Sequence, residues 1–292
     1  MKKIFKRIGW VIVSLLLLIG LGLGLFIYKA KYGFPFYDST PPELPKEMNS
    51  FSVLVFNKTN GFPHTEAIEA SIPVFEELGK QNGWTIFSTD NGAVFNSEQL
   101  SKFDLVIWNN ATGRNLKEDQ RVVFQEYMNN GGGYLGIHGA GDDSHHWPWY
   151  YKTLIGAQFS HHPIDKQIQE GNLSLVCETS SGLLCSKLSK ETKHSDEWYV
   201  FYDNPRDNGF TPLYTLDESG LSMNGNLGFL VKDKNFGMGK DHPIAWYKCL
   251  PNGGRTFYSA MGHNGNAFQS QFTKDLIESS IKWAGGLTGS CP

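Results

Sequence analysis

A glycine-rich stretch in the middle of the chain gives the strongest indication of chemistry. Residues 131–141 read Gly-Gly-Gly-Tyr-Leu-Gly-Ile-His-Gly-Ala-Gly, so a short apolar segment is followed at once by His138 among small residues. Two acids, Asp142 and Asp143, and two further histidines, His145 and His146, come next. Because ligands of open α/β sheets bind outside the carboxyl ends of the strands, we expect His138 to lie in a functional site at such an edge.

His138 occupies the position that a nucleophile holds in the strand-to-helix elbow of many α/β enzymes. Those elbows carry Ser or Cys, whereas Gly136-Ile137-His138-Gly139 offers an imidazole. Histidine is suited to general acid/base catalysis near neutral pH or to metal ligation. Covalent acyl transfer is therefore not expected, and a purely structural role for His138 under its loop is the alternative.

Three further residues are candidates for catalysis together with His138. His64 stands at the first turn of a predicted helix, where it either caps that helix or converges with His138. Glu197, in Asp196-Glu197-Trp198-Tyr199, is either the proton-transfer partner of a histidine or a solvated residue at the start of a strand. His263 lies in the glycine-containing turn 261–265 and is predicted to be a second site histidine.

Aromatic and polar residues near these groups are candidates for substrate binding. An indole face stacks on the apolar side of a sugar ring, and a guanidinium group can clamp an anionic or hydroxyl-rich ligand. The candidates are Asp142, Trp147, Trp149, His162, Trp198, Trp246 and Arg255. A capping role for Asp142 and a structural ion pair for Arg255 are the alternatives. Clustered His and Asp side chains also bind Zn²⁺ or Mn²⁺. No His-Glu-x-x-His motif occurs, so the sequence allows a divalent metal but does not identify its ligands.

The elements around these residues alternate as in a doubly wound, mostly parallel α/β sheet. Strands are predicted at 51–56, 84–88, 103–108 and 134–137, with helices at 64–82 and 115–131. The second half is a strand-rich decoration, with strands at 173–176, 198–202, 213–216, 244–249 and 256–260 and a closing helix at 267–284. We predict one domain over residues 50–286, followed by a C-terminal tail at 287–292.

The first 49 residues are predicted to tether this domain to a membrane. Residues 8–28 form a run of 21 without a charge, long enough to span a bilayer core of about 30 Å, and four cations precede the run. The positive-inside rule then places the N-terminus in the cytoplasm and the domain in the periplasm or outside the cell. Residues 1–31 are predicted to be an uncleaved anchor, and a cleaved signal peptide is the alternative. Residues 32–49 contain four prolines and are predicted to be an extended spacer that lifts the domain off the membrane.

Charge and cysteine content agree with an exported protein that does not bind nucleic acid. The 26 basic and 29 acidic residues give −3; without the six cations of residues 1–31, 20 basic and 29 acidic residues give −9. Phosphate binding needs a basic face, so a nucleic-acid partner is not expected. The four cysteines, Cys177, Cys185, Cys249 and Cys291, are compatible with disulfides in an oxidising compartment, and three pairings are open.

Together these motifs resemble the trehalose-utilisation (ThuA-like) family, whose fold is similar to that of class I glutamine amidotransferases with a flavodoxin-like core. The matching segments follow in the same order over residues 51–286, and they include 61–64, 131–140, 147–150, 162–163, 196–199, 243–246, 254–258, 262–263 and 281–285. The resemblance implies a role in carbohydrate metabolism, particularly of 3-keto sugars and disaccharides, with His138 in place of the amidotransferase cysteine. Amidotransferase activity is therefore not expected. A further His-Pro of the family is replaced here by residues 177–182.

Two functions agree with these observations. The first is a sugar isomerase, lyase or hydrolase in which His138 and Glu197, helped by His64 and His263, transfer protons on a carbonyl-bearing sugar, with or without a divalent metal. The second is a membrane-tethered sugar-binding or accessory protein that uses the same pocket without chemistry. Neither the substrate nor the oligomeric state follows from the sequence.

Overall fold

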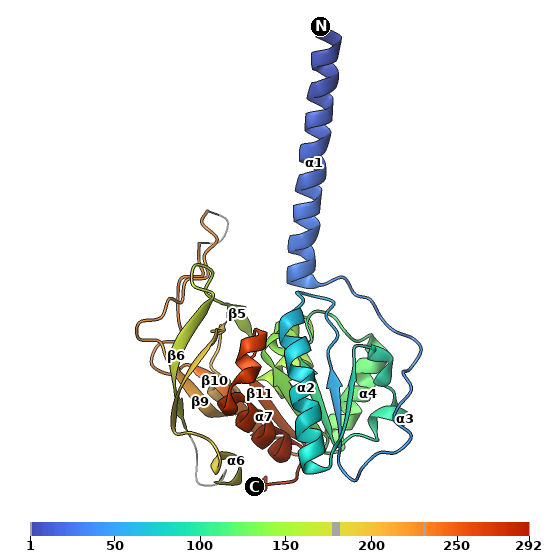
Figure 1. Cartoon of the computed structure of the whole chain (residues 1–292), viewed down its shortest axis with the longest axis vertical. Helices are drawn as coiled ribbons and strands as arrows, with labels where there is room; N and C mark the ends of the chain where they lie inside the picture. The colour runs from blue at the N-terminus through green and yellow to red at the C-terminus, as the bar shows by residue number, and fades with distance from the viewer. Residues whose placement is uncertain (1, 177–181, 230–231, 292) are drawn as a thin grey trace.

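Five parallel strands form one half of the central sheet, and they position the candidate site. The computed structural model describes residues 2–176, 182–229 and 232–291. The strands are β1 (Ser52–Phe56), β2 (Thr85–Thr89), β3 (Leu105–Asn109), β4 (Gly133–Ile137) and β11 (Arg255–Ser259), and they lie in the order β2-β1-β3-β4-β11 (Figure 1). Every residue of β1, β3 and β4 is buried, as expected for apolar parallel strands covered on both faces. The predicted doubly wound fold is confirmed, with the strand order of a flavodoxin-type core.

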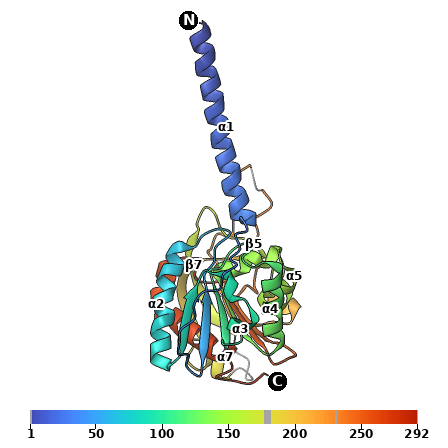
Figure 2. The same ribbon diagram turned by 90° about the vertical axis from the view of Figure 1, so that its right-hand side faces the viewer.

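Helices cover both faces of this parallel half (Figure 2). The helices α2 (Thr65–Asn82) and α7 (Gln271–Ala284) lie on one face, and α3 (Ser97–Leu100) and α4 (Glu118–Asn129) lie on the other. Alternate residues of β1 contact the two helix layers: Val53 packs in one core with Phe75 of α2, and Leu54 packs in the other with Phe124 of α4. The predicted closing helix is divided into η6 (Gly265–Gln269) and α7, because the Ser270 side chain caps the start of α7.

The second half of the chain extends the same sheet with antiparallel strands. These are β10 (Pro243–Cys249), β9 (Thr211–Asp217), β6 (Ile168–Leu175) and β7 (Glu191–Glu197). The edge strand β7 was not predicted because it is almost entirely polar. A separate pair joins β5 (Phe159–His161) to β8 (Val200–Phe201). The remaining short elements are η1 (Gly92–Val94), η2 (His138–His145), α5 (Pro148–Tyr150), η3 (Tyr151–Ile155), α6 (Gly182–Cys185) and η5 (Pro205–Asn208).

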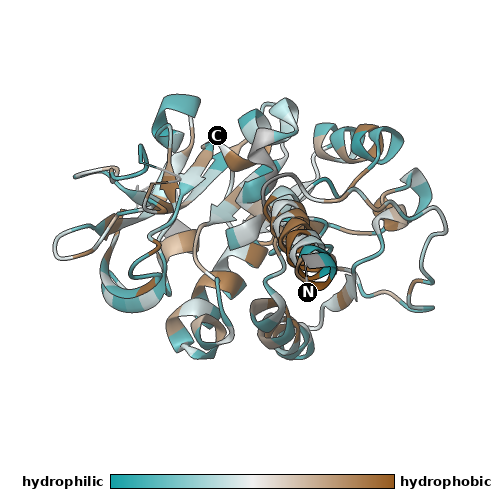
Figure 3. Cartoon of the chain, turned by 90° about the horizontal axis from the view of Figure 1, so that it is seen from above, coloured by the Kyte–Doolittle hydropathy of each residue, from teal (hydrophilic) through white to brown (hydrophobic). Residues whose placement is uncertain are grey.

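The helix α1 (Lys2–Tyr32) projects away from the domain (Figures 1 and 2). Within residues 3–29, a stretch of 18 residues has a mean hydropathy of 2.7 and is not buried by the rest of the chain. Viewed along α1, its apolar surface stands over the domain (Figure 3). Its length and composition therefore suit a membrane anchor, and a signal sequence would have the same properties.

Residues 33–49 lie along the domain and do not form a free spacer. The backbone N–H of Phe34 donates to Asn60 O at 3.0 Å, and Asp38 forms an ion pair with Lys58 at 2.7 Å. Further along, Gln99 Nε2 donates to Pro42 O at 2.7 Å. The polar groups of this segment are therefore bound to the domain at several points, and its expected role in lifting the domain off a membrane stays a prediction.

A disulfide fastens the C-terminal tail to the sheet. Cys249 of β10 pairs with Cys291, with the Cα atoms 5.6 Å apart. Arg255 adds hydrogen bonds to the carbonyl groups of Trp283, Thr288 and Gly289. Cys185 is also disulfide-bonded, whereas Cys177 lies outside the described residues.

Candidate functional site

Four residues that are far apart in the sequence meet at the carboxyl edge of the parallel strands. His64 follows β1, His138 follows β4, His263 follows β11, and Glu197 ends the antiparallel strand β7. One potential ligand atom from each of these side chains lies within 4.8 Å of all the others. The structure thus brings together the four residues that the sequence singled out for catalysis.

The turn that carries His138 is strained and held from several sides. His138 has a φ of +44° and Asn110, at the end of β3, has a φ of +52°; a positive φ is uncommon for residues other than glycine. Asn110 Oδ1 accepts the Gly139 N–H at 3.1 Å, and Asn110 Nδ2 donates to Gly262 O at 3.0 Å. A Cβ atom at position 139 would lie only 2.8 Å from the Thr112 side chain, so the turn requires glycine there. The predicted elbow is confirmed, and Asn110 ties it to the loop that carries His263.

The hydrogen bonds of His138 define which ring nitrogen is available for chemistry. His138 Nδ1 lies 2.7 Å from the carbonyl oxygen of Ala260, which can only accept, so Nδ1 carries a hydrogen. His138 Nε2 faces Glu197 Oε2 at 3.3 Å and His263 Nδ1 at 3.1 Å. In the neutral ring, Nε2 would direct a lone pair at a carboxylate oxygen. The lone pair and the negatively charged oxygen would repel each other, and a proton or a cation between Nε2 and Oε2 removes this repulsion.

Glu197 is the charged centre of the cluster, with a side chain that is 2% exposed. Its Oε2 lies 3.1 Å from His263 Nδ1, while Oε1 lies 3.0 Å from His162 Nδ1 and accepts Gln167 Nε2 at 2.7 Å. Burial acts to raise the pKa of Glu197, but hydrogen bonds to His138 and His263 outweigh it and hold the pKa well below the usual range. Glu197 is therefore ionised at neutral pH.

The environments of two histidines drive their pKa values in opposite directions. Burial, reinforced by the positive charges of His138 and His263, lowers the pKa of His64 well below its ordinary value. Burial also acts to lower the pKa of His263, but the hydrogen bond to Glu197 and its charge outweigh burial and raise that pKa. His64 is thus held neutral, whereas His263 favours its protonated form.

Asp196 holds the His263 loop in place, although the sequence did not single it out. Its buried carboxylate accepts three backbone N–H groups, from Glu197 at 2.9 Å, Gly262 at 2.7 Å and His263 at 3.0 Å. His194 Nε2 lies 3.2 Å away. Burial opposes ionisation of Asp196, but the bond to His194 and the charge of His138 help to give a lowered pKa. Neighbouring acids at the end of a strand were the available signal, yet the strand itself was not recognised.

The cluster opens into a cavity of about 260 Å³. Five of the predicted site residues line it, namely His64, Asp142, His162, Glu197 and His263, together with Phe62, Phe159, Gln167 and Tyr199. A second cavity of about 280 Å³ shares Phe62, His64 and His263 with the first. His138 is 0% exposed and is not part of this lining. It lies beneath His263 and Glu197, with its ring centroid 4.1 Å from that of Tyr199.

The four tryptophans expected to bind a substrate do not line this cavity, and neither does Arg255. Trp198 and Trp246 are buried and donate their indole N–H groups to the carbonyls of Gln169 and Ile155. Trp147 and Trp149 pack against Phe124 of α4. Arg255 begins β11 and binds the C-terminal tail at the opposite edge of the sheet. None of these five side chains lines the cavity, so their expected role in substrate binding stays a prediction without support from this lining; the aromatic residues of the cavity are Phe62, Phe159 and Tyr199.

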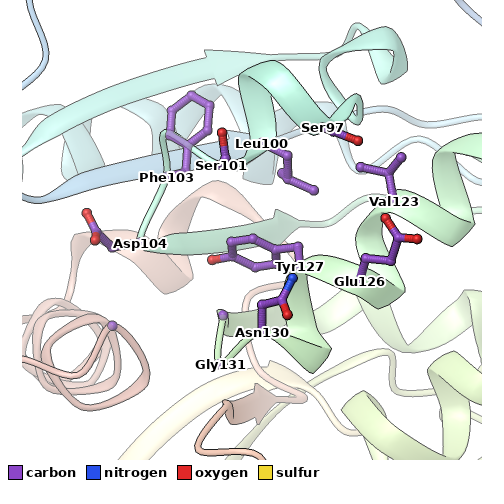
Figure 4. Close-up of a pocket in the computed structure, with 12 residues that line it drawn as sticks. Ser97, Leu100, Ser101, Phe103, Asp104, Val123, Glu126, Tyr127, Asn130 and Gly131 are labelled. Carbon is purple, nitrogen blue, oxygen red and sulfur yellow. The ribbon is translucent and has the colours of Figure 1, made fainter.

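A larger cavity of about 420 Å³ lies at the amino ends of β3 and β4 (Figure 4). Its polar lining groups already serve the fold: Asp104 accepts the Ser52 N–H at 2.8 Å, and the Tyr127 hydroxyl bonds to Gly133. No histidine lines it. Its chemistry therefore does not compete with that of the His64, His138, Glu197 and His263 cluster.

The domain is similar in sequence to one family over nearly its whole length. The sequence profile of ThuA, described as trehalose utilisation, matches residues 52–284. The chain belongs to the ThuA family. No curated protein matches the sequence.

Solved structures of ThuA-like proteins show the same fold. A ThuA-like protein of Bacteroides uniformis is 23% identical with a TM-score of 0.66, over 84% of this chain and 95% of that chain. A ThuA-like protein of Parabacteroides merdae is 16% identical with a TM-score of 0.59, over 82% of this chain and 91% of that chain. A GMP synthase subunit from Thermoplasma acidophilum is 14% identical with a TM-score of 0.47, over 83% and 97%. The two ThuA-like structures establish the fold of this ThuA-family chain, and its activity must be argued from the site.

Proposed function

We propose that this ThuA-family chain is a membrane-anchored enzyme of carbohydrate metabolism whose domain lies outside the cytoplasm. Its substrate class is a carbonyl-bearing sugar, such as a 3-keto glucoside or a keto disaccharide, and its chemistry is proton transfer. The observation that carries the proposal is the buried carboxylate of Glu197 in contact with His138, His162 and His263 at the wall of a cavity. The family's association with trehalose utilisation supports a carbohydrate substrate.

The exposure of the side chains assigns their roles. His64 and His263 both line the cavity and can touch a substrate, whereas His138 lies beneath them. His263, held protonated by Glu197, donates a proton to a carbonyl or glycosidic oxygen, and neutral His64 accepts the proton from the adjacent carbon. Two titratable groups with oppositely shifted pKa values are the arrangement that acid/base catalysis requires. His138 fixes Glu197 and His263 and is a positioning residue.

Turnover of 3-keto glucosides tests this assignment. We expect His263→Ala to lower kcat by about 10²- to 10⁴-fold, the usual contribution of a general acid, and added imidazole to restore part of it. His138→Ala should abolish turnover as well, because Glu197 and His263 lose their buried partner. His161→Ala is the control, since His161 binds Met223 O and does not line the cavity. Normal turnover in the first two variants would refute the assignment, and saturable sugar binding without product would favour the accessory protein.

The same cluster fits a divalent cation. His138 Nε2, His263 Nδ1 and Glu197 Oε2 form a triangle with sides of 3.1, 3.1 and 3.3 Å. Ligand atoms of a tetrahedral zinc site lie about 3.4 Å apart, given metal–ligand distances of about 2.1 Å. The second nitrogen of His138 binds a backbone carbonyl, as the outer nitrogen of a metal-bound histidine usually does. His64, His138, Glu197 and His263 would hold Zn²⁺ or Mn²⁺, which would polarise a sugar carbonyl.

Thermal unfolding with and without metal tests this second candidate. Zn²⁺ at 100 times its dissociation constant should stabilise the chain by about 2.7 kcal/mol, and a chelator should reverse the effect. Glu197→Gln should abolish it, because a neutral amide replaces the central carboxylate. The exposed Glu170→Gln is the control. No shift with either Zn²⁺ or Mn²⁺, together with metal-free purified protein, would leave acid/base chemistry by the side chains alone.

A further inference from the structure

Several exposed apolar side chains belong to segments that adjoin the end of α1 or the candidate site. Among the described residues after α1, the exposed large apolar side chains include Phe34, Phe36, Tyr37, Phe62, Ile164, Ile168, Tyr202, Leu227, Phe229 and Phe236. Val122 on α4 and Leu287 in the tail are also exposed, but they belong to other segments. Phe36 is 69% and Phe229 is 83% exposed, values unusual for phenylalanine in a water-soluble domain.

Parts of this set of exposed apolar residues, the apolar collar, lie beside the site. Phe62 lines both cavities of the cluster. The segment that carries Leu227 and Phe229 is attached beside His162, since Asn224 O accepts the Ile164 N–H at 2.8 Å and Lys234 Nζ donates to Ser160 Oγ at 2.8 Å. Both side views show this segment rising on the same side as α1 (Figures 1 and 2).

The attachment of α1 fixes how close the site lies to a bilayer. The charge-free run ends at Tyr28, and the helix continues for four residues, or about 6 Å, before the chain joins the domain. At that point Phe34 N–H donates to Asn60 O at 3.0 Å, and Asn60 begins the loop that carries Phe62 and His64. Four helical and two extended residues span at most about 13 Å, so Asn60, one hydrogen bond further on, lies within about 16 Å of the end of the charge-free run.

We infer that the cavity opens onto the membrane surface, and that the carbohydrate it takes is the head group of a membrane glycolipid. The inference rests on the anchored topology and the carbohydrate site of the proposed function. The collar seats in the interfacial region of the bilayer, where burial of exposed aromatic side chains is favourable. A head group presented on a lipid then reaches the cavity without leaving the surface, at a raised effective concentration.

Depth measurements on the full chain in nanodiscs test the orientation. A nitroxide label is placed at Phe36 or Phe229, and at Val122 or Leu287 as matched controls that are also apolar and exposed but lie away from the site. We expect the ratio of oxygen to nickel-chelate accessibility to be about threefold higher or more at the first pair. Equal, water-like ratios at all four positions would overturn the inference. Coupling between labels on two copies, with water-like ratios, would assign the collar to a second copy and would also overturn it.

Binding measurements test the substrate class separately. Diglucosyl diacylglycerol in the nanodisc should bind at least about tenfold more tightly than its water-soluble deacylated head group. The double variant Phe36→Ser/Phe229→Ser should reduce the difference in affinity between the glycolipid and its free head group, and it should leave the affinity for the free head group unchanged. Equal affinity for the two ligands in the unmodified chain would overturn the glycolipid assignment. Interfacial labels with no binding of either ligand would overturn the glycolipid assignment together with the proposed carbohydrate site. Loss of the chain from the discs would refute the anchor and overturn the inference with it, while leaving the proposed acid/base chemistry untouched.

Discussion

At the scale of single residues, Asp196 couples the two loops that supply Glu197 and His263. It accepts the backbone N–H groups of both residues and of Gly262. These bonds hold the side chains of Glu197 and His263 3.1 Å apart. Asp196 does not itself line the cavity, so its role is one of positioning.

Replacing Asp196 by Asn should therefore weaken both the fold and the site. The amide group would direct N–H donors at backbone N–H donors, and a buried donor without an acceptor costs about 1–3 kcal/mol. We expect a loss of that size in the urea-derived free energy of unfolding. We also expect kcat to fall about 10- to 100-fold with a smaller change in KM, because Asp196 holds the groups that contact the substrate and does not contact it itself.

Asp241→Asn is the matched control for this prediction. Asp241 is exposed and forms an ion pair with Arg206 at 2.9 Å. Its replacement should change the free energy of unfolding by about 0.5 kcal/mol or less. Equal effects of the two substitutions, or an unchanged kcat in Asp196→Asn, would contradict the positioning role.

At the scale of elements, the connection from β9 to β10 is closed by an ion pair behind the site. Glu218 accepts His242 Nδ1 at 2.8 Å and the Met238 N–H at 2.6 Å. His242 Nε2 lies 2.9 Å from Tyr199 O, and the Tyr199 ring lies against His138. Burial acts to raise the pKa of Glu218, but the bond to His242 and its charge outweigh burial and lower that pKa.

This lowered pKa predicts how stability depends on pH. Ionised Glu218 stabilises the fold fully above its unfolded pKa of about 4.5, and the contribution is lost as pH falls through the lower folded value. Unfolding by urea should therefore show that Glu218→Gln is less stable than the unmodified chain near pH 7. The difference should shrink below about pH 4.5.

The exposed Glu98→Gln controls for the loss of one negative charge, because Glu98 lies 3.9 Å from Lys102 on the protein surface. A constant difference between Glu218→Gln and the unmodified chain over the whole pH range would contradict the prediction.

At the scale of the whole molecule, the orientation of α1 in a membrane would decide the compartment of the site. Four cations precede the apolar run, so the positive-inside rule predicts a cytoplasmic N-terminus and a domain on the other side. The Cys249–Cys291 disulfide suits that compartment. The strap at residues 33–49 binds the domain directly below α1.

A fusion of alkaline phosphatase to the C-terminus should show phosphatase activity, because alkaline phosphatase folds only outside the reducing cytoplasm. The full chain should stay in the membrane after alkaline extraction and keep its N-terminus by mass spectrometry. Replacing Lys2, Lys3, Lys6 and Arg7 by Glu should lower the phosphatase activity. Release of a soluble chain that begins near Ala30 would identify a cleaved signal peptide instead.

The sequence by itself determined four of the five parallel strands and the helices between them, the elbow at His138 and the four residues of the cluster, whereas it assigned β11 to the decoration of the second half. These features depend on local patterns: buried parallel strands are continuously apolar, and the polar residues that follow such strands must meet at one edge. The family resemblance over residues 51–286 added the fold, and the matched range of 52–284 confirms it.

Only the tertiary structure decided which side of each element a residue faces. Trp198 and Trp246 have the same chemistry as sugar-binding residues, yet packing places them in the core with satisfied indole N–H groups. His138 lies beneath the cavity because β4 and its turn are covered by the loops of Glu197 and His263. Asp196 and the strap act through contacts between segments far apart in the chain, and no local pattern encodes such contacts.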